Sequence, residues 1–401
     1  MGGVCFKDAG AESVDAPTTS SPARTSTGPS PAGAPAPTLG RLARYKKVRV
    51  LGEGGFGTVW LIREKETNEE WAGKFLRVTD DPRRKDMMTR DDVLNECRVL
   101  ERMRHPNICG IKEHFEFGLG GTVVMVLELL NGGDLLDSVI NNGTYGEADA
   151  RRIFRQVLDG VTHMHEAGVV HRDLKVENLM MKRADDLDSV KIIDVGMAVE
   201  IASTPGADEL VKGTPEYMAP ESFGAGAAAR APSVDVWGLG CMLYILLGGY
   251  SPYAHEDPAE TVRLVARGEF HSFEDDPEVW SKVSDEAKDV IARCFETDPS
   301  TRVTTAGLRA HPWVASASAG PRLDATRANL DKNFRRKFRS AVDTVRATVR
   351  MQARLKAMAA LRSAGEGSAS AEEASSRASP GDVADEEDVR VEVVGGRSAS
   401  R

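Results

Sequence analysis

The chain has 401 residues, 41% of them hydrophobic and 6% aromatic, which is enough for one large domain or for two lobes with tails. Its net charge of −9 gives no reason to expect nucleic-acid binding. No apolar run reaches the roughly 20 residues of a membrane helix, no signal-peptide core is present, and the five cysteines have no paired spacing, so we expect a cytoplasmic protein with free thiols.

Residues 1–42 are rich in Ala, Pro, Ser, Thr and Gly, and such a segment buries too little surface to fold, which predicts disorder. Its first residues, MGGVCFK, contain two candidate acylation sites, Gly2 for myristate and Cys5 for palmitate. Phe6 stands where the myristoylation pattern has Ser or Thr. An ordinary N-terminus therefore competes with a lipid anchor that would attach the protein to a membrane.

Strands are predicted from Tyr45 to Leu76, where apolar and polar residues alternate around a glycine-rich turn. Glycines let backbone N–H groups close over phosphate oxygens, and a hairpin without a ligand is the alternative. A strand follows the glycines here, whereas a helix follows them in the dinucleotide-binding fingerprint. The residues of the turn fit GxGxxGxV and are Gly52, Glu53, Gly54, Gly55, Phe56, Gly57 and Val59.

A lysine and a glutamate are expected to pair beside the phosphates. Lys74 lies on the strand after next, and Glu96 lies among apolar residues at helical spacing in Asp91–Met103. A lysine buried near ATP needs such a counter-charge, although a solvated helical glutamate is the alternative. Val59 and Ala72 would supply apolar walls for a flat base.

A buried strand is predicted over Thr122–Leu130, leading into a flexible NGGD joint between two lobes. Leu127 would border the back of a nucleotide pocket. The backbones of Glu128 and Leu130 would hydrogen-bond adenine, and Asp134 would reach a ribose or a basic substrate side chain.

The octet HRDLKVEN, His171–Asn178, places a carboxylate (Asp173), an ammonium (Lys175) and an amide (Asn178) on one loop. Phosphoryl transfer needs an acceptor for the hydroxyl proton, a cation for the moving phosphoryl group and a neutral oxygen ligand for Mg²⁺. Asp194, at the end of the hairpin predicted next, would be the second oxygen ligand, and ATP phosphate oxygens would complete the site.

A segment poor in bulky apolar residues then closes with GTPEYMAPE. Within it, Thr214 is placed to hydrogen-bond Asp173 and Lys175, and Glu221 to pair with Arg302. Helices are predicted over 146–165 and through most of 234–313, including DVWGLGCMLYILL, which is apolar nearly all round and so belongs in a core. HPWV is expected to end the globular domain.

These motifs, in this order, make residues 45–313 resemble the eukaryotic protein kinases. The resemblance implies an α+β fold of two lobes, a small β-rich N-terminal lobe and a larger helical C-terminal lobe, with ATP and Mg²⁺ as cofactors between them. The Lys175 spacing and the GTPEY segment are the serine/threonine-specific pattern.

The resemblance also implies a role for each matching residue. Lys74 holds the α- and β-phosphates, Asp173 orients the acceptor hydroxyl, and Lys175 stabilises transferred charge, while Asn178 and Asp194 bind the metal. Two positions depart from the family pattern: Val195 replaces the Phe of DFG and Val176 replaces the Pro of the catalytic loop. A catalytically idle scaffold is the alternative function.

The C-terminal part looks most like the calcium/calmodulin-dependent protein kinases, through YILLGGYSPY, DPSTR and AHPWV. Residues 322–362 are predicted to form a basic amphipathic segment, which is typical of calmodulin targets. The resemblance implies that this segment blocks the substrate cleft until calmodulin removes it. A helix docked on its own domain or lying on a membrane surface is the alternative. The expected calmodulin anchors are Phe338, Val342, Val345 and Met351.

Two further expectations follow from charge. Asp134, Glu177 and Glu216 would leave a negative rim on the cleft, which predicts protein substrates that are basic upstream of the acceptor. In the activation segment, Asp208 and Glu209 would partly replace a phosphate, with Ser203 and Thr204 as alternative phosphate acceptors. Residues 363–401 are expected to form a disordered acidic tail.

Overall fold

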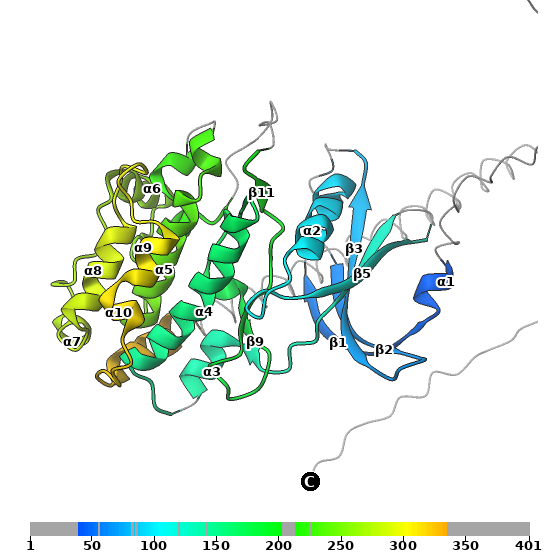
Figure 1. The fold of residues 1–401 in the computed structure, drawn as a ribbon, viewed down its shortest axis with the longest axis horizontal. Helices are drawn as coiled ribbons and strands as arrows, with labels where there is room; N and C mark the ends of the chain where they lie inside the picture. The colour runs from blue at the N-terminus through cyan, green and yellow to red at the C-terminus, as the bar shows by residue number, and fades with distance from the viewer. Residues whose placement is uncertain are drawn as a thin grey trace, which may run out of the picture.

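The computed structural model describes residues 39–334, except 55–56, 82–83, 85–86, 119–120, 142, 203–212 and 224–226. Figure 1 shows an antiparallel sheet with one long helix on one side of the molecule and a group of helices on the other. The predicted two-part α+β architecture is confirmed. No helix in this described part of the chain is both long and apolar enough to cross a membrane.

The N-terminal lobe is built on an antiparallel sheet with strand order β1-β2-β3-β6-β5, and a short β4 pairs in parallel with β3. Helix α2 covers one face of this sheet. The elements are α1 (Leu39–Leu42), β1 (Tyr45–Gly54), β2 (Gly57–Glu64), β3 (Glu70–Thr79), β4 (Met88–Thr89), α2 (Arg90–Arg102), β5 (Ile111–Phe117) and β6 (Thr122–Leu127).

The alternation of side chains along β6 explains why the sheet has two apolar faces. Val123 and Met125 belong to the main core, which also contains the apolar face of α2, whereas Val124 and Val126 belong to a second cluster. Leu42 packs against this second cluster. The prediction of disorder over residues 1–42 is therefore wrong at the end of this segment, because the packing of Leu42 stabilises the α1 turn.

The C-terminal lobe contains small strands near the cleft and helices behind them. The elements are β7 (Gly133–Asp134), α3 (Leu135–Asn141), α4 (Glu147–Glu166), β8 (Val169–Val170), η1 (Val176–Asn178), β9 (Leu179–Met181), β10 (Val190–Ile192), β11 (Val199–Glu200), η2 (Pro215–Tyr217), η3 (Pro220–Phe223), η4 (Ala227–Arg230), α5 (Ser233–Gly248), α6 (Pro258–Arg267), α7 (Pro277–Trp280), α8 (Asp285–Cys294), α9 (Thr305–Ala310) and α10 (Pro312–Ala315).

Helix α5 is the centre of this lobe, since all of its residues after Ser233 are buried. Its uniform apolar sequence predicted this position. Two small sheets, β10-β9-β7 and β11-β8, lie between the helices and the cleft. They carry the loops on which the candidate catalytic residues lie.

The sequence predicted that the globular packing ends at Trp313, but the packing continues beyond this residue. A further helix spans residues 324–334, and Leu323, Leu330 and Phe334 are buried in the main core. The backbone of Arg322 forms a bridge with Gly146 before α4. The first turns of the predicted basic helix thus belong to the C-terminal lobe.

Candidate active site

The catalytic loop lies between β8 and β9 and is held from below by Asp235 of α5. Asp235 is 2% exposed and accepts backbone N–H groups from His171 and Arg172, both at 2.8 Å. His165 Nε2 lies 2.7 Å from the same carboxylate. Burial raises the pKa of Asp235, but the contact with His165 and the loop N–H groups outweigh burial, so the pKa is lowered overall. A charged carboxylate therefore fixes the loop, in which Arg172 has a φ of 70°.

Asp173, Lys175 and Thr214 form one hydrogen-bonded cluster, as the sequence predicted. Asp173 Oδ1 accepts the Thr214 backbone N–H at 3.0 Å and its hydroxyl at 2.9 Å. Lys175 Nζ donates to Asp173 Oδ2 at 2.7 Å and to the Thr214 hydroxyl at 2.9 Å. The cluster holds a carboxylate and an ammonium together at the mouth of the cleft.

Asn178 and Asp194 supply the oxygen atoms that a magnesium ion prefers. The Asn178 amide donates to the Asp173 carbonyl at 3.0 Å, which leaves its Oδ1 as an available ligand. Asp194 Oδ1 accepts the Gly196 N–H at 2.9 Å, which leaves Oδ2. Burial raises the pKa of Asp194, but the charge of Lys74 and this N–H outweigh burial. The pKa is therefore lowered overall, and the carboxylate is charged at neutral pH. This donor set fits Mg²⁺.

Lys74 on β3 and Glu96 on α2 form the predicted ion pair, with 2.8 Å between Nζ and Oε1. Glu96 is 1% exposed. Burial lowers the pKa of Lys74, but attraction to Glu96 and Asp194 outweighs burial and raises it overall, so the lysine is charged. Asn95, beside Glu96, donates its side-chain amide to the Ala198 carbonyl at 3.2 Å, which ties α2 to the segment after Asp194.

A cavity of about 440 Å³ lies between the glycine-rich turn and these charged groups. The expected residues in its lining are Gly52, Glu53, Gly57, Val59, Lys74, Glu96, Asp173 and Asp194. Leu76, Met88 and Met197 add apolar lining that the sequence did not predict. Gly57 is required by close backbone packing, because a Cβ there would lie 2.0 Å from the Phe75 carbonyl oxygen.

Gly54 ends β1 and pairs with Gly57, whereas Gly55 and Phe56 lie outside the described residues. Ala72 and Leu127 face each other in the β3–β6 register, next to the cavity residues of β3. Neither residue lines this cavity. The sequence thus predicted the correct strands for Ala72 and Leu127, but these residues are not in the wall of this cavity.

The predicted strand Thr122–Leu130 ends at Leu127, and a hydrogen-bonded joint follows. The Glu128 N–H donates to the Gly110 carbonyl at 2.8 Å, so only the carbonyl of Glu128 remains for adenine. The Glu128 carboxylate forms ion pairs with Lys182 and Lys191, both at 2.7 Å. Leu130 is half-buried against the main core.

The three residues expected on an acidic rim lie on β7, η1 and η2. Asp134 accepts N–H groups from Leu136 and Asp137, and thus caps α3. Glu177 accepts the Tyr217 hydroxyl at 3.0 Å, and Glu216 is the residue before Tyr217 in η2. Asp134 and Glu177 therefore have structural partners as well as partial exposure.

The remaining predictions divide into two groups. The ion pair of Glu221 with Arg302 is confirmed by two contacts of 2.6 and 3.0 Å, and Val176 and Val195 are fully buried. The other group lies outside the described residues: Gly2, Cys5, Ser203, Thr204, Asp208, Glu209 and the calmodulin anchors Phe338, Val342, Val345 and Met351.

A family model described as "Protein kinase domain" matches residues 45–314. The chain belongs to the protein kinase family. Human serine/threonine-protein kinase H1 is 36% identical over 298 residues, which are 73% of this chain and 66% of the relative. The calcium/calmodulin-dependent protein kinase type I of Schizosaccharomyces pombe is 35% identical over 311 residues, 76% of this chain and 88% of the relative.

A third relative, calcium/calmodulin-dependent protein kinase type 1 of Caenorhabditis briggsae, is 36% identical over 287 residues, 71% of this chain and 76% of the relative. The chain spans about two thirds of the length of the kinase H1 relatives. Residues 45–314 are thus a protein kinase domain. Asp235 is the functional residue that reasoning from residue chemistry missed, because the run DVWGLGCMLYILL, which begins with it, was interpreted only as a core helix.

Proposed function

We propose that this chain transfers the γ-phosphoryl group of ATP to Ser and Thr hydroxyls of protein substrates, with Mg²⁺ as the metal. The observation that carries the proposal is the Asp173–Lys175–Thr214 cluster. Asp173 also lines the cavity that contains the Lys74–Glu96 ion pair and Asp194. Phosphoryl transfer depends on positioning and on charge stabilisation, and these groups supply both.

Each residue has a distinct role in this mechanism. Asp173 orients the acceptor hydroxyl and takes its proton, and Thr214 holds the carboxylate in place through Oδ1. Lys175 places its charge where the phosphoryl group moves, and Lys74 holds the α- and β-phosphates. Asn178 and Asp194 would hold Mg²⁺, which neutralises charge on the phosphate oxygens when bound.

The same site predicts a preference for basic substrates. Asp134, Glu177 and Glu216 contribute partly exposed carboxylates near the cleft. Opposite charges attract across such a surface and raise the rate of encounter. Peptides with Arg upstream of the acceptor Ser are the proposed substrate class.

Regulation by calmodulin is the second part of the proposal. It is supported by the basic sequence of residues 335–362 and by the names of two of the relatives. The helix at 324–334 packs on the C-terminal lobe, so the basic residues begin where the described packing ends. We propose that the segment beyond Phe334 covers the cleft until calcium-loaded calmodulin binds it.

A phosphorylation assay with the 401-residue chain, ATP, Mg²⁺, calcium and calmodulin tests the catalytic proposal. The substrates are a Ser peptide with Arg upstream and the same peptide with Glu in those positions. We expect transfer to the Arg peptide, and a loss of about 100-fold or more in Asp173→Asn, since general-base catalysis contributes at least this factor. The matched control is Asp159→Asn, because Asp159 lies on α4 outside the catalytic loop and pairs with Arg309 at the surface.

The outcomes separate the kinase from the idle scaffold. Equal rates for Asp173→Asn and the wild-type chain would contradict the proposed role of Asp173. A wild-type chain that binds ATP and calmodulin but transfers no phosphate would favour the scaffold. A preference for the Glu peptide would contradict the substrate class alone.

A further inference from the structure

The two proposed metal ligands lie at the open end of one hairpin, formed by β9 and β10. Asn178 directly precedes β9, and Asp194 is the second residue after β10. The register pairs Leu179 with Ile192, and the Ile193 N–H donates to the Asn178 carbonyl at 3.0 Å. The separation of the two ligands is therefore set by the pairing of these strands.

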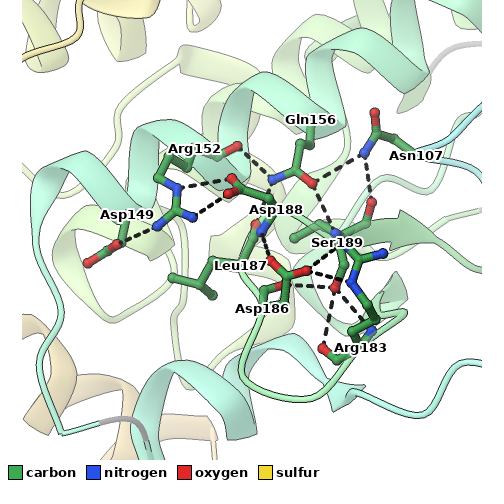
Figure 2. A network of polar contacts seen from close by, with 10 residues as sticks. Asn107, Asp149, Arg152, Gln156, Arg183, Asp186, Leu187, Asp188 and Ser189 are labelled. Carbon is green, nitrogen blue, oxygen red and sulfur yellow. Dashed lines mark hydrogen bonds and ion pairs between the residues drawn. The ribbon is translucent and has the colours of Figure 1, made fainter.

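The closed end of this hairpin, residues 182–189, is attached to α4 by the side chain of Gln156 (Figure 2). Gln156 Oε1 accepts the N–H of Val190, the first residue of β10, at 3.0 Å. Gln156 Nε2 donates to the Leu187 carbonyl at 2.7 Å and to the Arg152 carbonyl at 3.0 Å. One amide thus bonds the turn, the start of β10 and its own helix.

Asn107, in the loop between α2 and β5, adds a third element to this arrangement. Its amide donates to the Val190 carbonyl at 2.9 Å and to Gln156 Oε1 at 3.4 Å. The Ile192 N–H also donates to the Asn107 carbonyl at 2.9 Å. These bonds fix both ends of strand β10. Gln156 is the side chain that contacts Asn107 and the turn as well as β10.

The ion pair between this turn and α4 is different in kind. Arg152 pairs with Asp188 at 2.6 Å, but these side chains are 42% and 64% exposed. Exposed ion pairs contribute little, because water replaces them readily. The Arg152 ion pair therefore contacts the same turn but does not set the position of β10.

We propose that Gln156 is a positioning residue for the magnesium site, which it sets through the register and tilt of the β9–β10 hairpin. This inference rests on the proposed function. The amide is suited to the role because it accepts from β10 and donates to the turn at the same time. Its loss would let the hairpin shift and move Asp194 relative to Asn178, and residues behind metal ligands commonly control metal affinity in this way.

The test measures the affinity for a fluorescent ATP analogue with Mg²⁺ and with EDTA, using the full chain. In Gln156→Met we expect the Mg²⁺-dependent gain in affinity to fall by about tenfold, the low end for groups behind metal ligands. The affinity in EDTA should stay within about twofold, because no nucleotide contact changes. Gln156→Glu keeps the acceptor for Val190 and should show a smaller loss. Arg152→Met is the matched control, because Arg152 lies on the same helix as Gln156 and contacts the same turn, and it should behave as wild type.

Two results would overturn the inference. One is a Gln156→Met chain that unfolds at a lower temperature but keeps the wild-type gain from Mg²⁺, which would show a structural role alone. The other is a wild-type chain with no Mg²⁺-dependent gain. A wild-type chain that shows the gain but transfers no phosphate would contradict the proposed function, and the comparison of Gln156→Met with Arg152→Met would still decide the inference.

Discussion

At the scale of single residues, Asp134 is a capping carboxylate whose ionisation is opposed by burial. It caps α3 through the N–H groups of Leu136 and Asp137, at 2.9 and 3.1 Å. Burial nevertheless raises its pKa from 3.8 to about 6, against the effect of these two bonds. The folded chain therefore binds this proton more tightly than the unfolded chain does.

This shift predicts a pH-dependent effect of Asp134→Asn. Between about pH 4 and pH 6 the aspartate of the unfolded chain has lost its proton while the native aspartate still holds it, so its contribution to the free energy of unfolding falls as pH rises through this range. Asparagine keeps the cap and cannot ionise. We expect the variant to gain about 1–3 kcal/mol relative to wild type between pH 4 and pH 7.5, since one pKa unit is about 1.4 kcal/mol.

Urea unfolding at the two pH values measures this gain. Asp137→Asn is the control, because Asp137 lies on the same helix and is exposed. A difference between Asp134→Asn and wild type that is the same at both pH values would contradict the raised pKa.

The residues of the site differ in how far the sequence could predict them. Asp173, Lys175 and Asn178 were predictable because they share one loop, and Lys74 because a strand pattern surrounds it. Gln156 was not, because its partners are backbone groups and a single glutamine on a helix gives no pattern. The Glu128 N–H could not be assigned either, since its bond to Gly110 depends on how the loop before β5 meets the joint after β6.

At the scale of elements, the helix at 324–334 completes helix α5. The last carbonyl groups of any helix lack partners within it. Here three side chains from one face of the later helix donate to three successive carbonyls at the end of α5. Thr326 bonds Leu247 at 2.6 Å, Asn329 bonds Gly248 at 3.3 Å, and Asn333 bonds Gly249 at 3.0 Å.

We therefore expect Thr326→Val to destabilise the chain although it keeps the shape of the side chain. Thr326 is 1% exposed, so the Leu247 carbonyl would be left without a donor in a buried site. Such a loss costs about 1–3 kcal/mol. Urea unfolding measures it, with Thr301→Val as the control, because Thr301 is exposed and its hydroxyl bonds only the Asp298 carbonyl. Equal stability of the two variants would contradict the capping role.

The sequence predicted the type of most elements but not this contact. Helical spacing predicted 90–102 and 147–166 within one residue at the N-terminal boundary, because apolar periodicity marks the buried face. The same spacing cannot show which surface a basic helix touches. Residues 322–334 were therefore included in the predicted calmodulin-binding segment 322–362, whereas their apolar and amide side chains contact the C-terminal lobe.

At the scale of the whole molecule, residues 313–334 wrap around the start of α4. Glu147 there is buried, and it accepts the Trp313 indole N–H at 2.7 Å and the Ser284 hydroxyl at 2.8 Å. Its own N–H donates to the Pro321 carbonyl at 3.0 Å. A chain cut after Trp313 would lose the Pro321 contact together with Leu330 and Phe334, and would expose the part of the main core that these two side chains cover. The informative cut for autoinhibition lies after Phe334, where the described packing ends.

This boundary makes the regulatory proposal testable without confusing release with unfolding. A chain ending at Phe334 should melt within a few degrees of the 401-residue chain and should phosphorylate the Arg peptide without calmodulin, because it keeps the packed helix but lacks the basic segment. The 401-residue chain should have low activity alone and reach the rate of the shorter chain when calcium and calmodulin are added. Calmodulin should not change the rate of the shorter chain, which has lost all four expected anchors.

If the 401-residue chain is fully active alone, the basic segment does not cover the cleft. If the shorter chain is folded but inactive while the longer chain is active, residues beyond Phe334 support catalysis and do not inhibit it.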